Sequence, residues 1–555
     1  MRALLVHAQT PVTYWGYQHS LRLTGRACTL PPLGLISLAA LLPASWELRL
    51  IDLNVEPLTD ADLAWSEVVL VGGMLVQELS MHEVIAQARR AGKRVVAGGP
   101  APTTSPDAFL DADHVFCGEA EGKIHRLVRA LEQPTSTAPH VLSAWEQGDI
   151  ATIAPEPRPV MALAPTPRFD LLRAGKYVSL SLQFSRGCPF NCEFCDIIEV
   201  FGRVPRTKSP EQVLAELDAV YATGFRGPLF FVDDNFIGNR HAVASLLPVI
   251  ERWQAAHGAP FELYTEASMN LASMPELLKA MVDAGFRSVF VGIETPSPAA
   301  LLQTQKTQNL RMPPTEVVET LTRAGLEVYA GFIVGFDADG PEVFALQREF
   351  ISSVPIAMAM VGILSALPST QLGRRLEKEG RLRGRPSGDQ FQRPNFTPTM
   401  DEAVLVAGYR DLLADLFSPA NYYARCARLI RTLGPTRARP PDANGIATFF
   451  RASWALGVKG RDRGYYWRLI WTALRHARGN IARAVVAAVL GEHLIRYTRE
   501  DVIPRLNDAL RAIEGERAAR GAASSNVDGA VPLDAMPLPK PDVPGHEPAL
   551  EVVAT

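Results

Sequence analysis

The chain has 555 residues, enough for about three domains of ordinary size. Hydrophobic residues make up 47% of it and charged residues 21%, as in a globular protein rather than a disordered one. A net charge of −3 argues against a dedicated nucleic-acid binder, and six cysteines over this length do not form a disulfide framework. Since no apolar run has the length of a membrane span or a signal-peptide core, we expect a cytoplasmic protein.

Residues 1–140 alternate short β-rich runs with helical patterns. The expected strands are Arg2–His7, Glu47–Asp52, Glu67–Gly72, Arg94–Gly98 and His114–Cys117. The expected helices are Pro32–Leu42, Met81–Ala91 and one that follows the last strand and runs through Leu131. This alternation predicts an α/β domain with a doubly wound, flavodoxin-like parallel sheet and a ligand at the carboxyl ends of its strands.

Glycine-containing segments stand at three of these strand ends. They contain Gly72, Gly73 and Met74, then Gly98, Gly99 and Pro100, then Gly118 and Glu119. Glycine lets the backbone approach a large planar ligand closely, although ordinary strand-end turns use it as well.

Residues 141–175 are rich in proline and predict a linker, and residues 176–384 alternate strands and helices again. The expected strands are Ser179–Phe184, Leu229–Asp233, Phe261–Thr265, Ser288–Ile293, Val328–Val334 and Ala357–Ile363. The expected helices between them are Pro210–Thr223, Ala242–His257, Pro275–Ala284, Pro313–Ala324 and Pro341–Ser352. Six such units predict a partial (β/α)6 barrel rather than a closed barrel of eight.

Three cysteines follow the first strand of this barrel, with the spacing Cys-x3-Cys-x2-Cys: Cys188, Cys192 and Cys195. Thiolates are the ligands that select iron–sulfur clusters, zinc or copper. A structural zinc site has four ligands, and no fourth Cys or His lies close by in the sequence. A zinc knuckle with a distant fourth ligand, or three unrelated thiols, is the alternative. Three ligands would leave one iron of a cubane cluster open to a small molecule.

This spacing, with Phe194 just before the last cysteine, resembles the signature of the radical S-adenosylmethionine (SAM) enzymes. The resemblance implies a [4Fe–4S] cluster on the three cysteines, with SAM on the fourth iron. It also implies SAM contacts from Phe194 and from strand ends, namely Glu266, Glu294, Gly331, Ile333 and Gly335. For the carboxylates at these strand ends, including Asp233, the alternative is a capped strand end or a salt bridge.

A flavodoxin-like domain directly before such a core is similar to the cobalamin (B12)-binding domain of cobalamin-dependent radical SAM enzymes. The residues 31–35, 98–100 and 118–119 match that family, which implies that the glycine-containing strand ends named above contact cobalamin. The pattern Asp-x-His-x-x-Gly, which supplies an axial histidine in other cobalamin proteins, is absent. We therefore expect no protein imidazole on the cobalt.

The resemblance to class B radical SAM methylases implies two uses of SAM. One molecule would be cleaved to a 5′-deoxyadenosyl radical, and another would methylate cobalamin, which then methylates an unactivated carbon of a small-molecule or lipid-like substrate. It also implies an electron donor such as flavodoxin or ferredoxin. Cobalamin-assisted cyclisation or oxidation without methyl transfer is one alternative, and a non-catalytic corrinoid or SAM sensor is another.

Residues 385–512 predict a mostly α-helical domain, similar to a C-terminal extension found in a subfamily with hopanoid C-2 methylases. Between Arg425 and Val486 it holds thirteen Lys or Arg and two Asp, with aromatic residues interleaved. A solvated helix face over core aromatics explains this pattern, and so does a peripheral contact with the anionic inner membrane. Residues 513–555 are expected to be a disordered tail.

Overall fold

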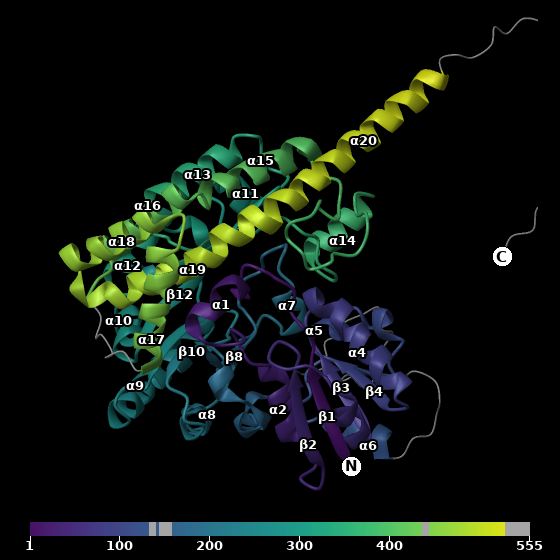
Figure 1. Ribbon diagram of the computed structural model, residues 1–555. Helices are drawn as coiled ribbons and strands as arrows, with labels where there is room; N and C mark the ends of the chain where they lie inside the picture. Colours follow the sequence, from purple (N-terminus) through teal and green to yellow (C-terminus); the bar gives the residue numbers. More distant parts are fainter. Residues whose placement is uncertain (133–139, 144–157, 436–442, 528–555) are drawn as a thin grey trace, which may run out of the picture. The chain divides into compact units, whose positions relative to one another are not determined.

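The computed structural model describes residues 1–132, 140–143, 158–435 and 443–527. Within it, Met1–Leu510 form one compact unit, in which two parallel sheets pack with a set of C-terminal helices. Figure 1 shows the N-terminal sheet in purple and blue, the barrel mostly in teal, and the C-terminal helices in green and yellow.

The N-terminal sheet has six parallel strands in the order β2-β1-β3-β4-β5-β6. The strands are β1 (Arg2–His7), β2 (Glu47–Asp52), β3 (Val68–Gly72), β4 (Arg94–Gly98), β5 (His114–Cys117) and β6 (His140–Ser143). The chain reverses its winding direction between β1 and β3, where His7 pairs with Gly72. Ligands of flavodoxin-like sheets bind at such a switch point. The predicted doubly wound sheet is confirmed, and β6 extends it to Ser143, inside the stretch predicted as linker.

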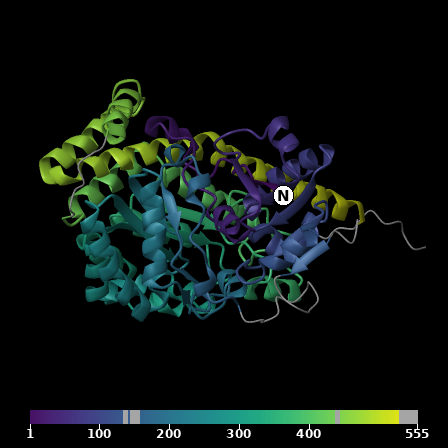
Figure 2. The same ribbon diagram turned by 90° about the horizontal axis from the view of Figure 1, so that it is seen from below.

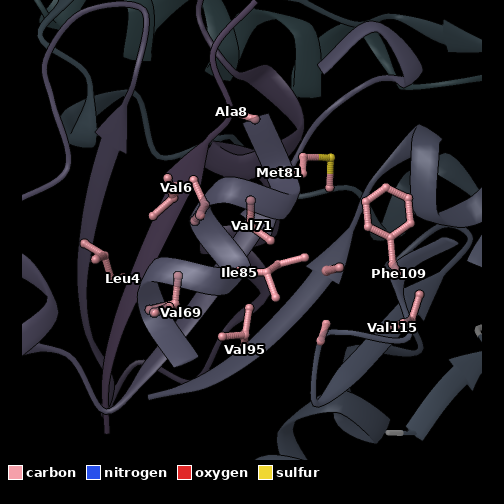
Figure 3. Close-up of a cluster of buried hydrophobic side chains, with 14 of the residues drawn as sticks. Leu4, Val6, Ala8, Val69, Val71, Met81, Ile85, Val95, Phe109 and Val115 are labelled. Atoms are coloured by element: carbon pink, nitrogen blue, oxygen red, sulfur yellow. The ribbon is translucent and has the colours of Figure 1, made fainter. Parts of the chain in front are cut away.

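Helices cover both faces of this sheet because its strand residues point alternately to either side. On one face lie α3 (Asp60–Trp65), α4 (Glu78–Arg90) and α5 (Pro100–Thr104), and on the other α2 (Leu33–Leu41) and α6 (Ile124–Glu132). Figure 3 shows the first face, where Val69 and Val71 meet Met81 and Ile85 of α4. Each fully buried side chain of this size stabilises the fold by roughly 1.5–3 kcal/mol, which fixes the strand ends that carry the site.

The second sheet is a partial barrel of six parallel strands in the order β14-β13-β12-β11-β10-β7. The strands are β7 (Leu180–Leu182), β10 (Gly227–Phe231), β11 (Phe261–Glu266), β12 (Phe286–Glu294), β13 (Glu327–Val334) and β14 (Ala359–Ile363). Between them run α8 (Pro210–Ala222), α9 (Arg240–Ala256), α10 (Pro275–Asp283), α12 (Pro314–Arg323) and α13 (Val343–Ser353). Helix α8 begins with a capping box of Ser209 and Gln212, followed by Pro210 at its first position. The predicted (β/α)6 barrel is confirmed, and its helices form the teal outer layer in Figure 2.

The C-terminal helices pack on the barrel. They are α14 (Gln371–Lys378), α15 (Glu402–Leu416), α16 (Pro419–Thr432), α17 (Ala443–Ala452), α18 (Arg463–His476) and α19 (Ile481–Tyr497). The buried Arg425 of α16 donates hydrogen bonds to the carbonyls of Ile356 and Leu416, which joins this helix to the last barrel strand region. The predicted α-helical C-terminal domain is confirmed.

A further helix, α20, spans Ile503–Val527. The expected disordered tail is therefore helical as far as residue 527, and its remaining residues lie outside the described ones. None of the helices in the described part of the chain is both long and apolar enough to cross a bilayer.

Candidate active site

The three motif cysteines lie together in the loop after the first barrel strand. Burial raises the pKa of the Cys188 and Cys195 thiols, and each of the two interacts electrostatically with Cys192. The side-chain amide of Asn235 lies 3.8 Å from the Cys188 sulfur, and that of Gln308 lies 3.5 Å from the Cys192 sulfur. These donors suit thiolates, because hydrogen bonds to the sulfurs tune iron–sulfur clusters.

A site for one metal ion and a site for a cubane cluster place their ligands differently. Among the residues that the structure describes, no three His, Cys, Asp or Glu side chains are close enough to bind a single metal ion. A cubane cluster needs a wider arrangement, because each thiolate binds a different iron atom.

The start of the cysteine loop is fixed by Asp233 and Gly187. The buried Asp233 carboxylate accepts hydrogen bonds from the backbone N–H groups of Phe184, at 3.0 Å, and Ser185. Burial raises the pKa of Asp233 to about 6 in spite of these donors. Gly187 has a φ of +95°, and a Cβ there would lie 2.7 Å from the carbonyl oxygen of Gly202, so only glycine fits directly before Cys188. Asp233 is thus a structural residue of the loop.

A buried network of charges ties this loop to the end of β5. Arg186 contacts Glu119 and Glu121, each at 2.7 Å, and Arg206 contacts Glu119 at 2.8 Å. Burial tends to raise the pKa of Glu121, but the hydrogen bonds and charge of Arg186 outweigh it and hold this pKa below its usual range. Glu119, a predicted cobalamin contact, is therefore already paired with two arginines.

A second set of ion pairs holds the other end of the loop. Glu193, between the second and third cysteines, pairs with Arg375 of α14 at 2.6 Å, and Arg375 also reaches Asp337 at 2.9 Å. Arg381 pairs with the same Asp337, whose pKa these contacts hold far below its usual range in spite of its partial burial. The cysteine loop is thus fixed between the N-terminal sheet and α14, the first helix after the barrel.

A cavity of about 1420 Å³ is lined by the N-terminal sheet, the barrel interior and the C-terminal helices. It is larger than the ~300–1,000 Å³ of most small-molecule sites, so it has room for more than one small ligand. All eight predicted cobalamin contacts line it: Gly72, Gly73, Met74, Gly98, Gly99, Pro100, Gly118 and Glu119. Gly99 has a φ of +101°, and a Cβ there would lie 3.2 Å from the carbonyl oxygen of Gly73. Glycine thus allows the loops after β3 and β4 to pack against each other, and it leaves their backbone atoms uncovered by side chains on the cavity side.

The sequence analysis did not predict that one histidine and several residues of the C-terminal region line the cavity. His7 lines the cavity at the switch point, and burial lowers its pKa. It stands at the end of a strand rather than in the usual cobalamin-ligand pattern, which is why that pattern could not reveal it. From the C-terminal region come residues 387–392 and Arg483, Val486 and Leu490 of α19, whose positions follow only from the tertiary fold.

Of the predicted SAM contacts, Glu266 is the one that lines this cavity. Within the described part of the chain no hydrogen-bond donor meets its carboxylate. Burial, followed by the charges of Asp234 and Asp233, raises the pKa of Glu266 to about 8. A half-buried carboxylate with no hydrogen-bond donor beside it suits a cationic ligand.

Glu294 lies instead beside the cysteine loop, where it forms an ion pair with Lys306. Lys306 stands over the Phe194 ring at 5.7 Å and interacts electrostatically with Cys192 and Cys195. Glu294 has a φ of +66°, which is unusual for a residue other than glycine and is often found at functional sites. Nothing in the local sequence around Lys306 indicated this pairing.

The remaining predicted SAM contacts gather around the end of β13. Phe194 and Ile333 pack against a cluster that includes Phe336 and Leu364, with the Phe194 and Phe336 rings 5.9 Å apart. The N–H of Gly335 donates to Asp339, and Gly331 lies against Phe290, where a Cβ would come within 2.9 Å of the ring. None of these four residues lines the large cavity, although Gly331 packs against Phe290, which does.

Comparisons with known proteins agree with this geometry. Family models match residues 182–344 as the radical SAM superfamily, 23–128 as a B12 binding domain, and 370–503 as a domain of unknown function, DUF4070. The last match begins at residue 370, earlier than the predicted boundary at 385. An uncharacterized methyltransferase of Synechocystis is 39% identical over 518 residues, which cover 92% of this chain and 94% of the relative. The hopanoid C-2 methylase of Rhodopseudomonas palustris is 35% identical over 510 residues, covering 90% and 94%.

The chain belongs to the cobalamin-dependent radical SAM methylases. Its fold matches that of the radical SAM methyltransferase TsrM from Kitasatospora setae, with a TM-score of 0.56 and 17% identity over 88% of this chain and 99% of that one. The cobalamin-dependent radical enzyme OxsB gives a TM-score of 0.55 at 14% identity over 92% and 83%. The methylase therefore uses a [4Fe–4S] cluster, SAM and cobalamin, and the cysteine loop and the glycine-lined cavity fit these groups.

The unpaired Glu266 carboxylate gives a pH-dependent prediction for this methylase. Replacing Glu266→Gln should weaken SAM binding roughly 10- to 100-fold, the worth of a hydrogen bond to a charged group. In the wild-type chain SAM binding should strengthen as the pH rises through about 8, because the carboxyl group then loses its proton. Isothermal titration between pH 6.5 and 9 measures both effects, with the exposed Glu276→Gln on α10 as the control.

The same group affects stability without ligand. The folded chain keeps the Glu266 proton up to about pH 8, whereas the unfolded chain loses it near pH 4.3. This group therefore lowers the free energy of unfolding as the pH rises between these values. Asp233 and Asp234, whose pKa values are raised to about 6 and 7, add to the slope. In the Glu266→Gln variant the free energy of unfolding should fall less steeply with pH than in the wild-type chain. Equal slopes in the two chains would contradict the raised pKa of Glu266.

Proposed function

We propose that the methylase acts on a lipid-like, largely apolar substrate that lies in the large cavity. The observation that carries this proposal is the continuity of the cavity, which runs from the glycine-lined strand ends into the barrel interior. Its barrel wall includes Phe230, Tyr264 and Phe290, and Val486 and Leu490 of α19 lie on the C-terminal side. Because one relative is named a hopanoid C-2 methylase, a hopanoid is the first substrate to test.

Each set of residues has a role in this proposal. Cys188, Cys192 and Cys195 hold the cluster, and Glu266 and Glu294 with the β13 end hold SAM. The glycines at the ends of β3, β4 and β5 lie against the corrin. When bound, these groups supply a hydrogen-abstracting radical and a methyl donor. The protein positions the substrate carbon between them and keeps water away, which is what the closed C-terminal wall of the cavity does.

Product mass separates methylation from the alternative of cyclisation or oxidation. The chain reconstituted with iron, sulfide, cobalamin, SAM and a low-potential reductant should convert a hopanoid to a product one CH₂ unit heavier, and should release 5′-deoxyadenosine. The variant with all three motif cysteines changed to Ala should lose its cluster iron and form neither product. Cys426→Ala, at a buried thiol among the C-terminal helices, serves as the control. Release of 5′-deoxyadenosine with a product of unchanged mass would support the alternative chemistry instead.

A surface on α17, the segment after it (Ser453–Val458) and α18 favours contact with an anionic membrane. Phe450, Trp454, Trp467 and Trp471 expose 65%, 57%, 45% and 64% of their surface, although Tyr466 between them is buried. Exposed basic side chains stand in the same segments, and one of them, Lys459, lies over the Trp454 ring at 5.3 Å. They are Lys459, Arg461, Arg463, Arg468 and Arg475. Exposed apolar side chains in a group mark an interaction site, and tryptophan with basic residues is typical of the membrane interface. We refer to these nine residues as the aromatic–basic surface.

Liposome flotation tests this membrane contact. Each basic residue near an anionic leaflet contributes about 1 kcal/mol, and the attraction should weaken at 1 M salt, where the Debye length is about 3 Å. We expect binding to anionic vesicles at low salt, its loss at high salt, and a clear reduction in the Trp454→Ala/Trp471→Ala variant. Val204→Ala/Leu302→Ala, at exposed apolar residues elsewhere, is the matched control. Absence of binding to anionic vesicles at low salt would refute the contact.

A further inference from the structure

The cavity follows β11 along its length. Glu262, Tyr264 and Glu266 alternate with the buried Phe261, Leu263 and Thr265 and all three line the cavity. Glu262 and Glu266 are four positions apart, which corresponds to about 13 Å along a strand. The cavity therefore reaches from the carboxyl end of the strand, where Glu266 lies, to its beginning.

An ion pair lines the cavity at the beginning of the strand. Arg483 of α19 donates to the Glu262 carboxylate at 3.3 Å and lies 3.5 Å from Glu327 at the start of β13. The Arg483 side chain is 15% exposed and Glu327 only 3%, whereas 41% of the Glu262 side chain remains exposed. Glu262 lines the cavity, so a carboxylate fixed by an arginine faces a space whose walls are otherwise largely apolar.

Between the two ends the wall is aromatic and aliphatic. Phe230 stacks on Tyr264 with the ring centres 4.6 Å apart, and Trp15 meets Phe290 edge to face at 5.2 Å. These side chains line the cavity together with Val486 and Leu490. This stretch suits hydrocarbon, although hydroxyl groups such as those of Ser288 and Tyr329 also line the barrel part of the cavity.

We infer that the Glu262–Arg483 pair binds a hydrogen-bond-donating end of the substrate, a hydroxyl or an ammonium group, while its apolar body lies along Phe230 and Phe290. This inference rests on the proposed function. Arg483 holds the Glu262 carboxylate in place, and the free part of that carboxylate accepts the hydrogen bond. The distance from Glu262 to the Glu266 end then selects which substrate carbon reaches the reaction site. The DUF4070 region, which supplies Arg483, thereby takes part in substrate selection.

A simpler role for the pair is to attach α19 to the barrel. The two roles predict different preferences in ligand binding. An attachment has no effect on the choice between a polar and an apolar ligand of equal length, whereas a binding site for a polar end creates that choice.

Binding of three matched probes to the full-length chain separates the roles. Hexadecane, 1-hexadecanol and 1-hexadecylamine are delivered from cyclodextrin, and each displaces the fluorescent probe 1-anilinonaphthalene-8-sulfonate from the cavity. We expect the alcohol or the amine to bind roughly tenfold or more tightly than the alkane. Preference for the amine alone would identify an ammonium group, and equal preference for both would identify a hydroxyl.

Two variants and one control complete the experiment. Glu262→Gln, which keeps the size of the side chain, and Arg483→Gln should each reduce the preference for a polar end to near one. Arg496→Gln, at the other end of α19 in an exposed pair with Glu500, should leave it unchanged. Equal binding of all three probes to the wild-type chain, or an unchanged preference in Glu262→Gln, would overturn the inference alone. Failure of every probe to bind would overturn the lipid-like substrate of the proposed function as well.

Discussion

The buried pairing of Arg186 and Arg206 with Glu119 and Glu121 is the interaction on which the arrangement of the site depends. It joins the end of β5 in the cobalamin-type sheet to the residues directly before Cys188. A buried ion pair adds little net stability, but loss of one partner leaves a buried charge and costs about 3–5 kcal/mol. The network therefore specifies one position of the cysteine loop relative to the glycine-lined strand ends. A radical and a methyl donor can meet on one substrate only if this position is maintained.

The closure of the cavity gives the C-terminal region its role. The loop 387–392 and the inner face of α19 form wall that neither the sheet nor the barrel supplies. Gly388, with a φ of +76°, lies against the backbone of Leu75 and Val76, and Arg385 pairs with Glu78 at 3.4 Å. The aromatic–basic surface lies on other helices of the same region. An apolar cavity closed by a region whose other helices carry the aromatic–basic surface is consistent with a substrate that comes from a lipid phase.

Much of the fold follows from the sequence because it rests on local patterns. Strands β1, β2, β4 and β5 have the predicted bounds, since each is a short apolar run between turn residues. The cysteine spacing and the strand-end glycines likewise carry their chemistry in adjacent positions. What the sequence could not show depends on partners far apart in the chain: Arg186 with Glu121, Glu294 with Lys306, and Arg483 with Glu262. Charged residues are common on surfaces, so only the tertiary fold reveals which ones are buried together. For this reason the sequence predicted Glu119 as a cobalamin contact but not its pairing with Arg186 and Arg206. The binding of the cluster by the three cysteines, and the contacts of the other named residues with SAM and cobalamin, stay predictions.

Electron paramagnetic resonance of the reconstituted chain tests most directly whether the network holds both cofactors at one cavity. With cobalamin in its cob(II)alamin form, reduction of the [4Fe–4S] cluster places two paramagnetic centres in the same protein. If the cysteine loop and the glycine-lined strand ends face one another, the cob(II)alamin signal should broaden or split on cluster reduction. Glu121→Gln should diminish this effect, because Arg186 then keeps only one of its two carboxylate partners, Glu119. A cob(II)alamin signal that is unchanged by reduction of the cluster in the wild-type chain would contradict the account.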